Sequence, residues 1–156
     1  MIQRTTRPLS VEEQHSIKRG LPFLRTRSRR QDIVAGRAEV LEFPVVHAWT
    51  LITCSGPPCC PNSWLFQSSP DEFVYLESWD VANAVEGHFP GDHVRVSCLP
   101  ASRRLLDFSV SGRLVPVDEQ IVDESLLPLF PQTGVECRVF RSEELPEQLL
   151  AALHAV

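Results

Sequence analysis

From residue 33 onward, apolar and polar residues alternate with a period of two, and prolines and glycines separate the alternating runs. In a strand, successive side chains point to opposite faces, so a period of two is typical of strands that bury one face. Proline cannot donate to a ladder and glycine adopts turn conformations, so the 13 prolines and 7 glycines of the chain divide it into short strands. The pattern therefore predicts an α+β fold made mainly of antiparallel β-strands.

The predicted strands cover residues 38–52, 64–67, 73–79, 93–99, 105–117 and 135–140. Pro44 falls inside the first run, so we expect an edge position, a bulge or a break at that point. Gly112 falls inside the run 105–117 and predicts a bulge there.

Helices are predicted near both ends of the chain and between strands. Ser10 and Glu13 fit a capping box, which predicts a short helix ended by Gly20 and Pro22. Ser142 is expected to cap a C-terminal helix with one apolar stripe, which consists of Leu145, Leu149, Leu150 and Leu153. Further short helices are predicted over residues 80–86 and 119–130, and residues 1–9 are expected to be unstructured.

Positive charge concentrates near the N-terminus. Residues 1–37 hold nine basic and three acidic residues, whereas the remainder holds six basic and 17 acidic residues. We therefore divide the chain into a basic N-terminal arm, residues 1–31, and a single α+β domain, residues 32–156. The arm contains the arginine cluster Arg25, Arg27, Arg29 and Arg30. Such a run is commonly a solvated linker, and the alternatives are a phosphate-binding arm or a nuclear import signal.

The composition is that of an ordinary globular domain, with 43% hydrophobic and 22% charged residues among 156. No stretch approaches the roughly 20 apolar residues of a membrane helix, and the first thirty residues lack the apolar segment of a secretory signal. We therefore expect a cytoplasmic protein without a membrane span. Because its five cysteines are an odd number, we expect reduced thiols rather than a disulfide framework.

The order of elements over residues 38–117 is three strands, a short helix and two strands. This order resembles that of the OB-fold, a small barrel with a short helix between strands 3 and 4. The resemblance implies a binding face on strands 2 and 3, flanked by the loops 54–62 and 100–104. The candidate ligand-binding residues are then Trp64, Phe66, Phe73, Tyr75, Arg103 and Arg104. Aromatic rings for stacking and arginines for phosphate suit a single-stranded nucleic acid. The alternative is that the rings fill the core.

Two groups of residues are candidates for a chemical site. Cys54, Cys59 and Cys60 could supply thiolates to a metal or form a redox pair, with His88, His93 and Cys98 as further ligands, but their spacing differs from that of a zinc knuckle. The turn holding His88, Asp92 and His93 could do acid–base work. No nucleophile elbow, glycine-rich phosphate loop or metalloprotease motif accompanies these residues. We therefore predict no catalytic residue, no metal site and no cofactor.

These observations favour a non-enzymatic binding module. The first hypothesis is a protein-interaction protein of the antitoxin, immunity or adaptor kind, whose acidic body and exposed aromatics engage a basic or amphipathic polypeptide. The second is a single-stranded nucleic-acid-binding protein that uses the aromatic face and the arginine arm. The third is a small metal- or redox-active protein built on the cysteine loop.

Overall fold

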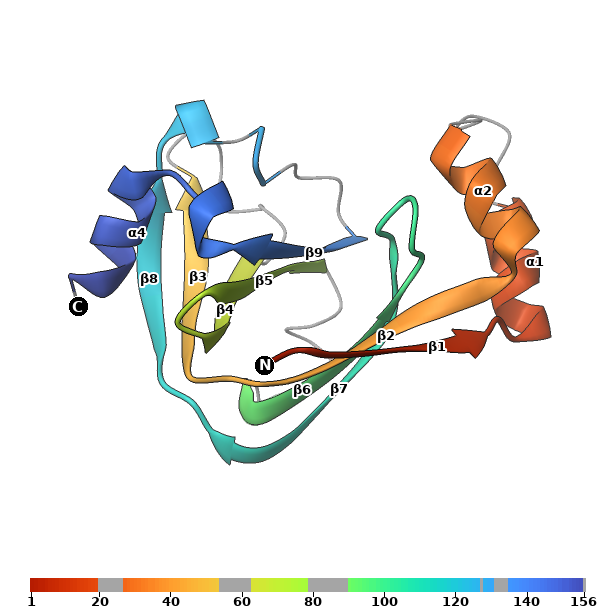
Figure 1. The fold of residues 1–156 in the computed structure, drawn as a ribbon, viewed down its shortest axis with the longest axis horizontal. Coiled ribbons are helices and arrows are strands. Elements are labelled where there is room, and N and C mark those ends of the chain that lie inside the picture. The colour runs from red at the N-terminus through yellow and green to blue at the C-terminus, as the bar shows by residue number, and fades with distance from the viewer. Residues whose placement is uncertain (20–26, 54–62, 79–89, 127, 131–134, 156) are drawn as a thin grey trace.

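The computed structural model describes residues 1–19, 27–53, 63–78, 90–126, 128–130 and 135–155, and its strands form two sheets (Figure 1). The first sheet has the order β1-β2-β6-β7, and its strands are β1 (Gln3–Pro8), β2 (Arg37–Pro44), β6 (Gly91–Cys98) and β7 (Leu105–Leu114). The second sheet has the order β8-β3-β4-β5-β9, and its strands are β8 (Val117–Val122), β3 (His47–Thr53), β4 (Ser63–Ser69), β5 (Glu72–Ser78) and β9 (Val135–Arg141). Neighbouring strands are antiparallel except β3 and β8, which are parallel. The predicted class, α+β and mainly antiparallel, is therefore confirmed.

The chain passes between the sheets three times, from β2 into β3, from β5 back to β6 and from β7 into β8. Pro44 ends β2, and the next two residues bond to different sheets. The Val45 N–H donates to the Asp92 carbonyl of β6 at 2.8 Å, and the Val46 N–H donates to the Gln67 carbonyl of β4 at 2.8 Å. The break expected at Pro44 is thus the corner between the sheets.

The core has two large parts, one on each face of the second sheet. Between the sheets lie Leu41, Phe43, Val94 and Val96 of the first sheet against Phe66, Val74 and Leu76 of the second. On the outer face of the second sheet, Trp49, Leu65, Phe73 and Tyr75 pack under Leu145, Leu149 and Leu153. Because both faces are covered, β4 and β5 carry continuous apolar runs rather than clean alternation.

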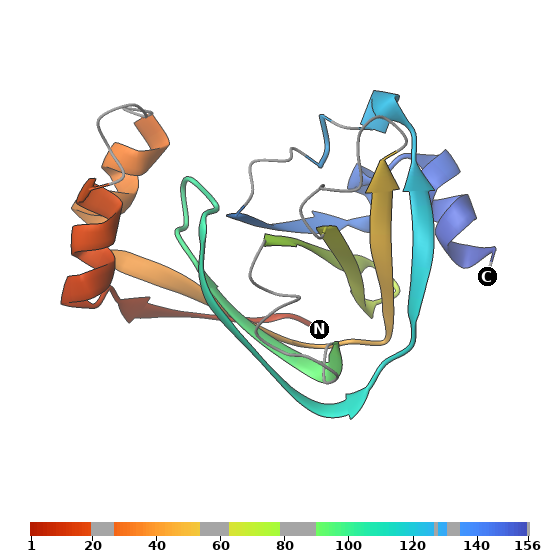
Figure 2. The ribbon, with the colours of Figure 1, turned by 180° about the vertical axis from the view of Figure 1, so that it is seen from behind.

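Helices cover the two ends of the molecule. Helix α4 (Glu147–His154) lies on the second sheet, preceded by the 3₁₀ turn η2 (Ser142–Glu144), so the predicted C-terminal helix is confirmed and Ser142 begins the turn instead of capping the helix. Helices α1 (Val11–Arg19) and α2 (Arg27–Ala35) lie side by side at the opposite end from α4 (Figures 1 and 2). A smaller cluster that includes Ile17 and Ile33 packs these helices against Ala38 and Leu99.

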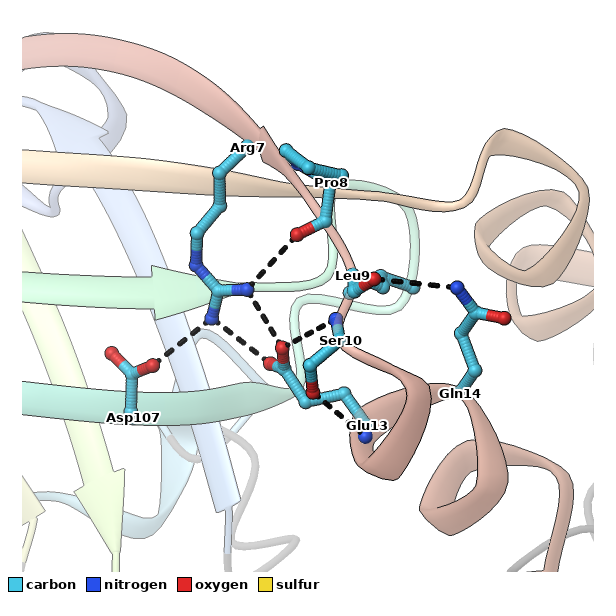
Figure 3. A network of polar contacts seen from close by, with 7 residues as sticks. All are labelled: Arg7, Pro8, Leu9, Ser10, Glu13, Gln14 and Asp107. Carbon is cyan, nitrogen blue, oxygen red and sulfur yellow. Dashed lines mark hydrogen bonds and ion pairs between the residues drawn. The ribbon is translucent and has the colours of Figure 1, made fainter.

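The N-terminal segment differs from the expectation of an unstructured stretch over residues 1–9. Residues 3–8 form β1, which pairs with β2 from Gln3↔Glu42 to Pro8↔Arg37. Its polar sequence lacks alternation because β1 is an edge strand with exposed side chains. The Arg7 guanidinium donates to Glu13 at 2.7 Å and to Asp107 of β7 at 3.0 Å (Figure 3). The boundary proposed at residue 31 falls inside α2.

The capping box that begins α1 is present as predicted. The Glu13 N–H donates to Ser10 Oγ at 3.1 Å, and the Ser10 N–H donates to Glu13 Oε1 at 3.0 Å (Figure 3).

The helix predicted over residues 119–130 is wrong. Residues 117–122 form β8, and among the described residues that follow, Glu124–Leu126 make a 3₁₀ turn, η1. Pairing with β3 over Ala48↔Val117 to Thr53↔Val122 outweighs the weak local preference of this polar stretch.

The OB-like order of strands is not accompanied by a closed barrel in the part of the chain that the structure describes. The two sheets are open there, with β1 and β7 at the edges of the first and β8 and β9 at the edges of the second. The short helix predicted over residues 80–86 lies outside the described residues. The predicted bulge at Gly112 is confirmed, since the β6–β7 register shifts between Gly91 and His93 and Gly112 has φ +84°.

Candidate binding site: an arginine hollow between two sheet edges

The aromatic residues singled out from the sequence lie in the core. Phe66, Phe73 and Tyr75 are fully buried, and Trp64 is half-buried against the core between the sheets. Phe66 faces the first sheet, whereas Phe73 and Tyr75 face α4. Because both faces of the second sheet are covered, these rings offer bases no stacking surface in this structure. Phe66, Phe73 and Tyr75 therefore match the alternative stated from the sequence, in which the aromatic rings fill the core.

The two arginines of the predicted rim lie in the turn between β6 and β7, where they point to different neighbours. Arg103 has φ +62°, an uncommon conformation for a residue with a side chain. Its Nε donates to the Cys137 carbonyl of β9 at 3.1 Å, and its own carbonyl accepts the Cys137 N–H at 3.0 Å. These bonds join the turn of the first sheet to the edge of the second.

Beside this junction lies a hollow of about 410 Å³, which we call the arginine hollow. Its lining consists of Arg4, Arg103, Arg138, Val139, Phe140 and Glu144. Arg4 belongs to β1, the edge of the first sheet, and Arg138 belongs to β9, the edge of the second. The hollow therefore lies between two sheet edges that belong to distant parts of the sequence.

Backbone groups of β9 open toward this hollow. Cys137 bonds outward to Arg103, and the Arg141 N–H bonds outward to the Glu144 carboxylate. In an antiparallel pair, alternate residues direct their N–H and C=O groups to the same side, so Val139 also directs its peptide groups away from β5. Among the described residues β9 is the edge strand of the second sheet, so no further strand pairs with the outward peptide groups of Val139. Val139 thus presents an open donor and an open acceptor.

Three of the six residues that line the hollow are arginines. The Glu39 carboxylate accepts from Arg4 at 3.1 Å and from Arg103 at 2.6 Å, so one anion is shared by two cations. Burial opposes the charged form of Arg103, but Cys98 and Glu39 outweigh it and raise the pKa of this guanidinium. Arg138, which has an interaction partner of its own, and Glu144 also line the hollow. Such a wall favours an anionic ligand.

A second hollow adjoins the first along β1. It measures about 450 Å³, and its lining is Arg4, Thr5, Thr6, Arg37, Ala38, Glu39 and Pro100. Because Arg4 lines both hollows, together they offer a path for an extended ligand.

The predicted arm contributes to a separate basic surface on α2. Arg27, Arg29 and Arg30 lie on this helix, and Arg25 lies outside the described residues. Burial and the charge of Arg29 lower the pKa of the Arg104 guanidinium. The structure therefore brings together one predicted arm residue, Arg29, and one predicted rim residue, Arg104.

Most of the cysteine and histidine residues that the sequence suggested as metal or redox ligands lie outside the described residues. Cys54, Cys59, Cys60 and His88 lie outside the described residues, and the described part of the chain holds no group of three or more His, Cys, Asp or Glu residues that could bind a metal ion. Sequence reasoning missed a pair on the second sheet, in which His47 Nε2 lies 2.7 Å from Asp118 Oδ2. The imidazole stacks on Trp49 with 4.4 Å between ring centroids. No pattern in the sequence indicates that His47 and Asp118, which are 71 positions apart, lie in contact.

Arg4 and Arg138 were also missed as site residues. Arg4 counted only as arm charge, and Arg138 lay in a predicted strand without a motif. Their proximity follows from the pairing of β1 with β2 and of β9 with β5, which the sequence pattern does not reveal.

Comparison of the chain with protein-family models, with curated proteins and with solved structures found no match. Among the described residues, none of the helices has the length and apolar character needed to cross a membrane. The fold and the hollow thus define the class only as a two-sheet α+β protein with a basic groove between its edges.

Proposed function

We propose that this protein is a non-enzymatic protein-interaction module whose arginine hollow binds an extended acidic segment of a partner polypeptide. The observation that carries the proposal is the position of Arg4, Arg103 and Arg138 beside the open peptide groups of Val139. We propose that a module of this kind acts as an adaptor, an immunity protein or an antitoxin.

Both the backbone of β9 and the arginine side chains of the hollow take part in this binding. A partner segment that lies along β9 pairs its backbone with the Val139 N–H and C=O, as in the addition of a strand to a sheet edge. Alternate side chains of that segment point to the same face. Carboxylates at these positions then meet the guanidinium groups of Arg4 and Arg138, which can bind a carboxylate through two parallel hydrogen bonds.

The basic hollow suits a partner of the opposite charge to the one expected from the sequence. The sequence suggested that the acidic body and exposed aromatics engage a basic or amphipathic polypeptide. Because Phe66, Phe73 and Tyr75 are buried, the aromatic contribution is absent from the proposal. The basic hollow instead suits an acidic partner.

Fluorescence anisotropy with a labelled peptide of alternating Glu and Thr residues tests the proposal. We expect binding that weakens with salt, and a loss of affinity of about tenfold or more in the double variant Arg4→Gln/Arg138→Gln. The matched control is Arg113→Gln on β7, whose side chain is 96% exposed and does not line the hollow. Unchanged affinity in the double variant overturns the proposal.

A second peptide tests the pairing with the strand edge. Methylation of alternate backbone nitrogens removes the donors of a β-ladder while the carboxylates stay. We expect this peptide to lose binding. Equal binding of both peptides would show that charge alone acts and would remove strand addition from the proposal.

The second candidate is single-stranded nucleic-acid binding on the α2 surface, and the proximity of Arg29 and Arg104 favours it. Anisotropy with a mixed-sequence single-stranded oligonucleotide tests it, with Arg29→Gln/Arg104→Gln as the variant. Removal of residues 1–31 is not a suitable variant, because it deletes β1 from the first sheet. Salt-sensitive binding that the variant abolishes supports this candidate, and no binding at low salt discards it.

A further inference from the structure

A polar group on β1 and β2 lines the second hollow, beside the arginine hollow. Successive side chains of a strand alternate between faces, so Arg4 and Thr6 of β1 share one face. The ladder pairs Arg4 with Leu41, a residue of the core between the sheets, so this face looks toward the second sheet. Arg37 and Glu39 of β2 lie on the same face, because Glu39 pairs with Thr6. The second hollow is thus lined by Arg4, Thr6, Arg37 and Glu39 together.

The Arg37 guanidinium uses few of its donors within the described part of the chain. Its Nη2 donates to Thr6 Oγ1 at 3.0 Å, and no described carboxylate forms an ion pair with it. Since a guanidinium carries five N–H donors, others remain for a ligand. The Thr6 oxygen accepts the bond from Arg37, so the Thr6 O–H is still able to donate. Arg37 and Thr6 therefore form a pair of donors at the surface.

Glu39 is already engaged by other arginines. Its Oε1 accepts from Arg4 at 3.1 Å, and its Oε2 accepts from Arg103 at 2.6 Å. The Glu39 side chain is only 14% exposed, which keeps these two bonds away from solvent. The residues that line the second hollow include two arginines and one acid, and that acid is shared with a third arginine. The second hollow therefore favours an anion at Arg37.

The donors at this position suit a phosphate monoester better than a carboxylate. A phosphorylated side chain carries a charge of about −1.5 to −2 at neutral pH and three acceptor oxygens. A guanidinium can donate to two of these oxygens in parallel, and a hydroxyl can donate to the third. A carboxylate has one charge and two oxygens, so it leaves one of these donors unused.

We propose that the second hollow binds the phosphate group of a phosphorylated serine or threonine in the partner segment. This inference rests on the proposed function and describes the partner more closely, as an acidic polypeptide that carries a phosphate. Arg4 lines both hollows, so an extended segment can reach from the edge of β9 to Arg37. The phosphate then accepts from the Arg37 guanidinium and the Thr6 hydroxyl, while the acidic residues occupy the arginine hollow.

The position of this site favours a polypeptide over a lipid headgroup. The second hollow adjoins the arginine hollow, whose strand edge can pair with an extended chain. Its acid Glu39 and the partner of that acid, Arg103, are only 14% and 22% exposed. A single side chain of an extended segment can enter such a hollow. A flat bilayer would have to approach both sheets at once.

Fluorescence anisotropy with phosphorylated forms of the Glu–Thr peptide tests the proposal. One threonine is phosphorylated near the amino end, in the middle or near the carboxyl end. A matched set of peptides carries glutamate at each of these positions. We expect at least one phosphorylated peptide to bind about tenfold tighter than its glutamate counterpart. Equal affinities at all of these positions overturn the proposal.

Two variants locate the phosphate, after far-ultraviolet circular dichroism has checked that each is folded. Arg37→Gln should bring the ratio of the two affinities close to unity, and Thr6→Val should reduce it by a smaller factor. The ratio is the readout because it cancels any change in the binding of the acidic residues. Arg113→Gln is the matched control, since Arg113 lies outside both hollows, and it should keep the ratio. An unchanged ratio in Arg37→Gln places the phosphate elsewhere and overturns the proposal.

The outcomes separate this inference from the proposed function. Binding of the glutamate peptides without a gain from phosphate keeps the acidic partner and removes the phosphate site. Binding of a phosphorylated peptide alone, weakened by Arg37→Gln, supports the phosphate site and overturns the arginine hollow as a site for carboxylates. If no peptide binds but vesicles that contain phosphatidic acid do, the ligand is a lipid and both proposals are overturned. The absence of all binding also overturns both.

Discussion

Gly91 begins β6 at a position where the backbone of β7 leaves no room for a side chain. A Cβ at this position would lie 2.2 Å from the Ser111 carbonyl oxygen, which the β-ladder holds in place. We expect Gly91→Ala to lower the free energy of unfolding by about 2 kcal/mol or more, measured by urea denaturation. Gly36→Ala is the control, because Gly36 has φ +62° but no atom within 4 Å of the added carbon. It should cost only about 1 kcal/mol, and an equal or larger loss for Gly36→Ala would contradict this account.

Glu13 contributes to stability in a pH-dependent way. The hydrogen bond from Arg7 lowers the pKa of the Glu13 carboxyl to about 2, with Ser10 adding to the effect against desolvation. Because the folded pKa lies below the unfolded one, this contribution is complete above pH about 4.5 and is lost as pH falls through about 2. The network lies at the surface, where solvent screens it, so we expect a contribution of only about 1 kcal/mol.

Urea denaturation of Glu13→Gln across this pH range checks the expectation. The difference in unfolding free energy from the unchanged protein should be constant above pH about 5 and should vanish near pH 2. Glu12→Gln is the matched control, because Glu12 lies exposed in the same first turn of α1. A difference that persists at pH 2 would mean that Glu13 acts through packing instead of charge.

At the scale of elements, Asp32 attaches α2 to the turn between β6 and β7. Its side chain is fully buried and accepts the Ala101 N–H at 2.8 Å and the Ser102 N–H at 2.9 Å. We expect Asp32→Ala to cost about 2–3 kcal/mol, because it leaves two backbone donors without an acceptor. Asp32→Asn keeps one oxygen and should cost less. Hydrogen exchange at Ala101 and Ser102 should accelerate most in Asp32→Ala, and unchanged protection there would show that α2 and the turn are held by other contacts.

Elements that depend on local signals were predictable from the sequence, and elements that depend on pairing were not. The capping box of Ser10 and Glu13, the break at Pro44 and the bulge at Gly112 each follow from one or two residues, and the structure has all three. Strand β1 has no apolar alternation, and the polar stretch of β8 is fixed by its parallel partner β3. Tertiary pairing thus overrides weak local propensity in both strands.

The candidate site was predictable only in part for the same reason. Arg103 was identified because the OB-like order of strands places its loop beside a binding face. Arg4 and Arg138 reach the hollow through the pairing of β1 and β9, which no local pattern encodes. The aromatic residues were assigned to a surface because the sequence does not show that the second sheet is covered on both faces.

At the scale of the whole molecule, the chain passes three times between the sheets, at β2–β3, β5–β6 and β7–β8, so neither sheet can unfold without strain on the other. We therefore expect one cooperative transition, although the core has two separate large clusters. Leu153→Ala removes a buried side chain under α4, and Leu41→Ala removes one between the sheets. Each should cost about 2–5 kcal/mol and shift the whole transition.

Tryptophan fluorescence and far-ultraviolet circular dichroism during urea unfolding measure this cooperativity. In a Trp64→Phe/Trp79→Phe background, Trp49 alone reports on the cluster under α4, whereas the circular dichroism signal reports on both sheets. Coincident curves in both variants are the expected result, because the chain that passes repeatedly between the sheets couples the unfolding of one to the other. If Leu153→Ala shifts only the fluorescence curve, the outer face of the second sheet unfolds as a separate unit. The corners at Val45 and Val46 would then act as hinges that leave the first sheet intact.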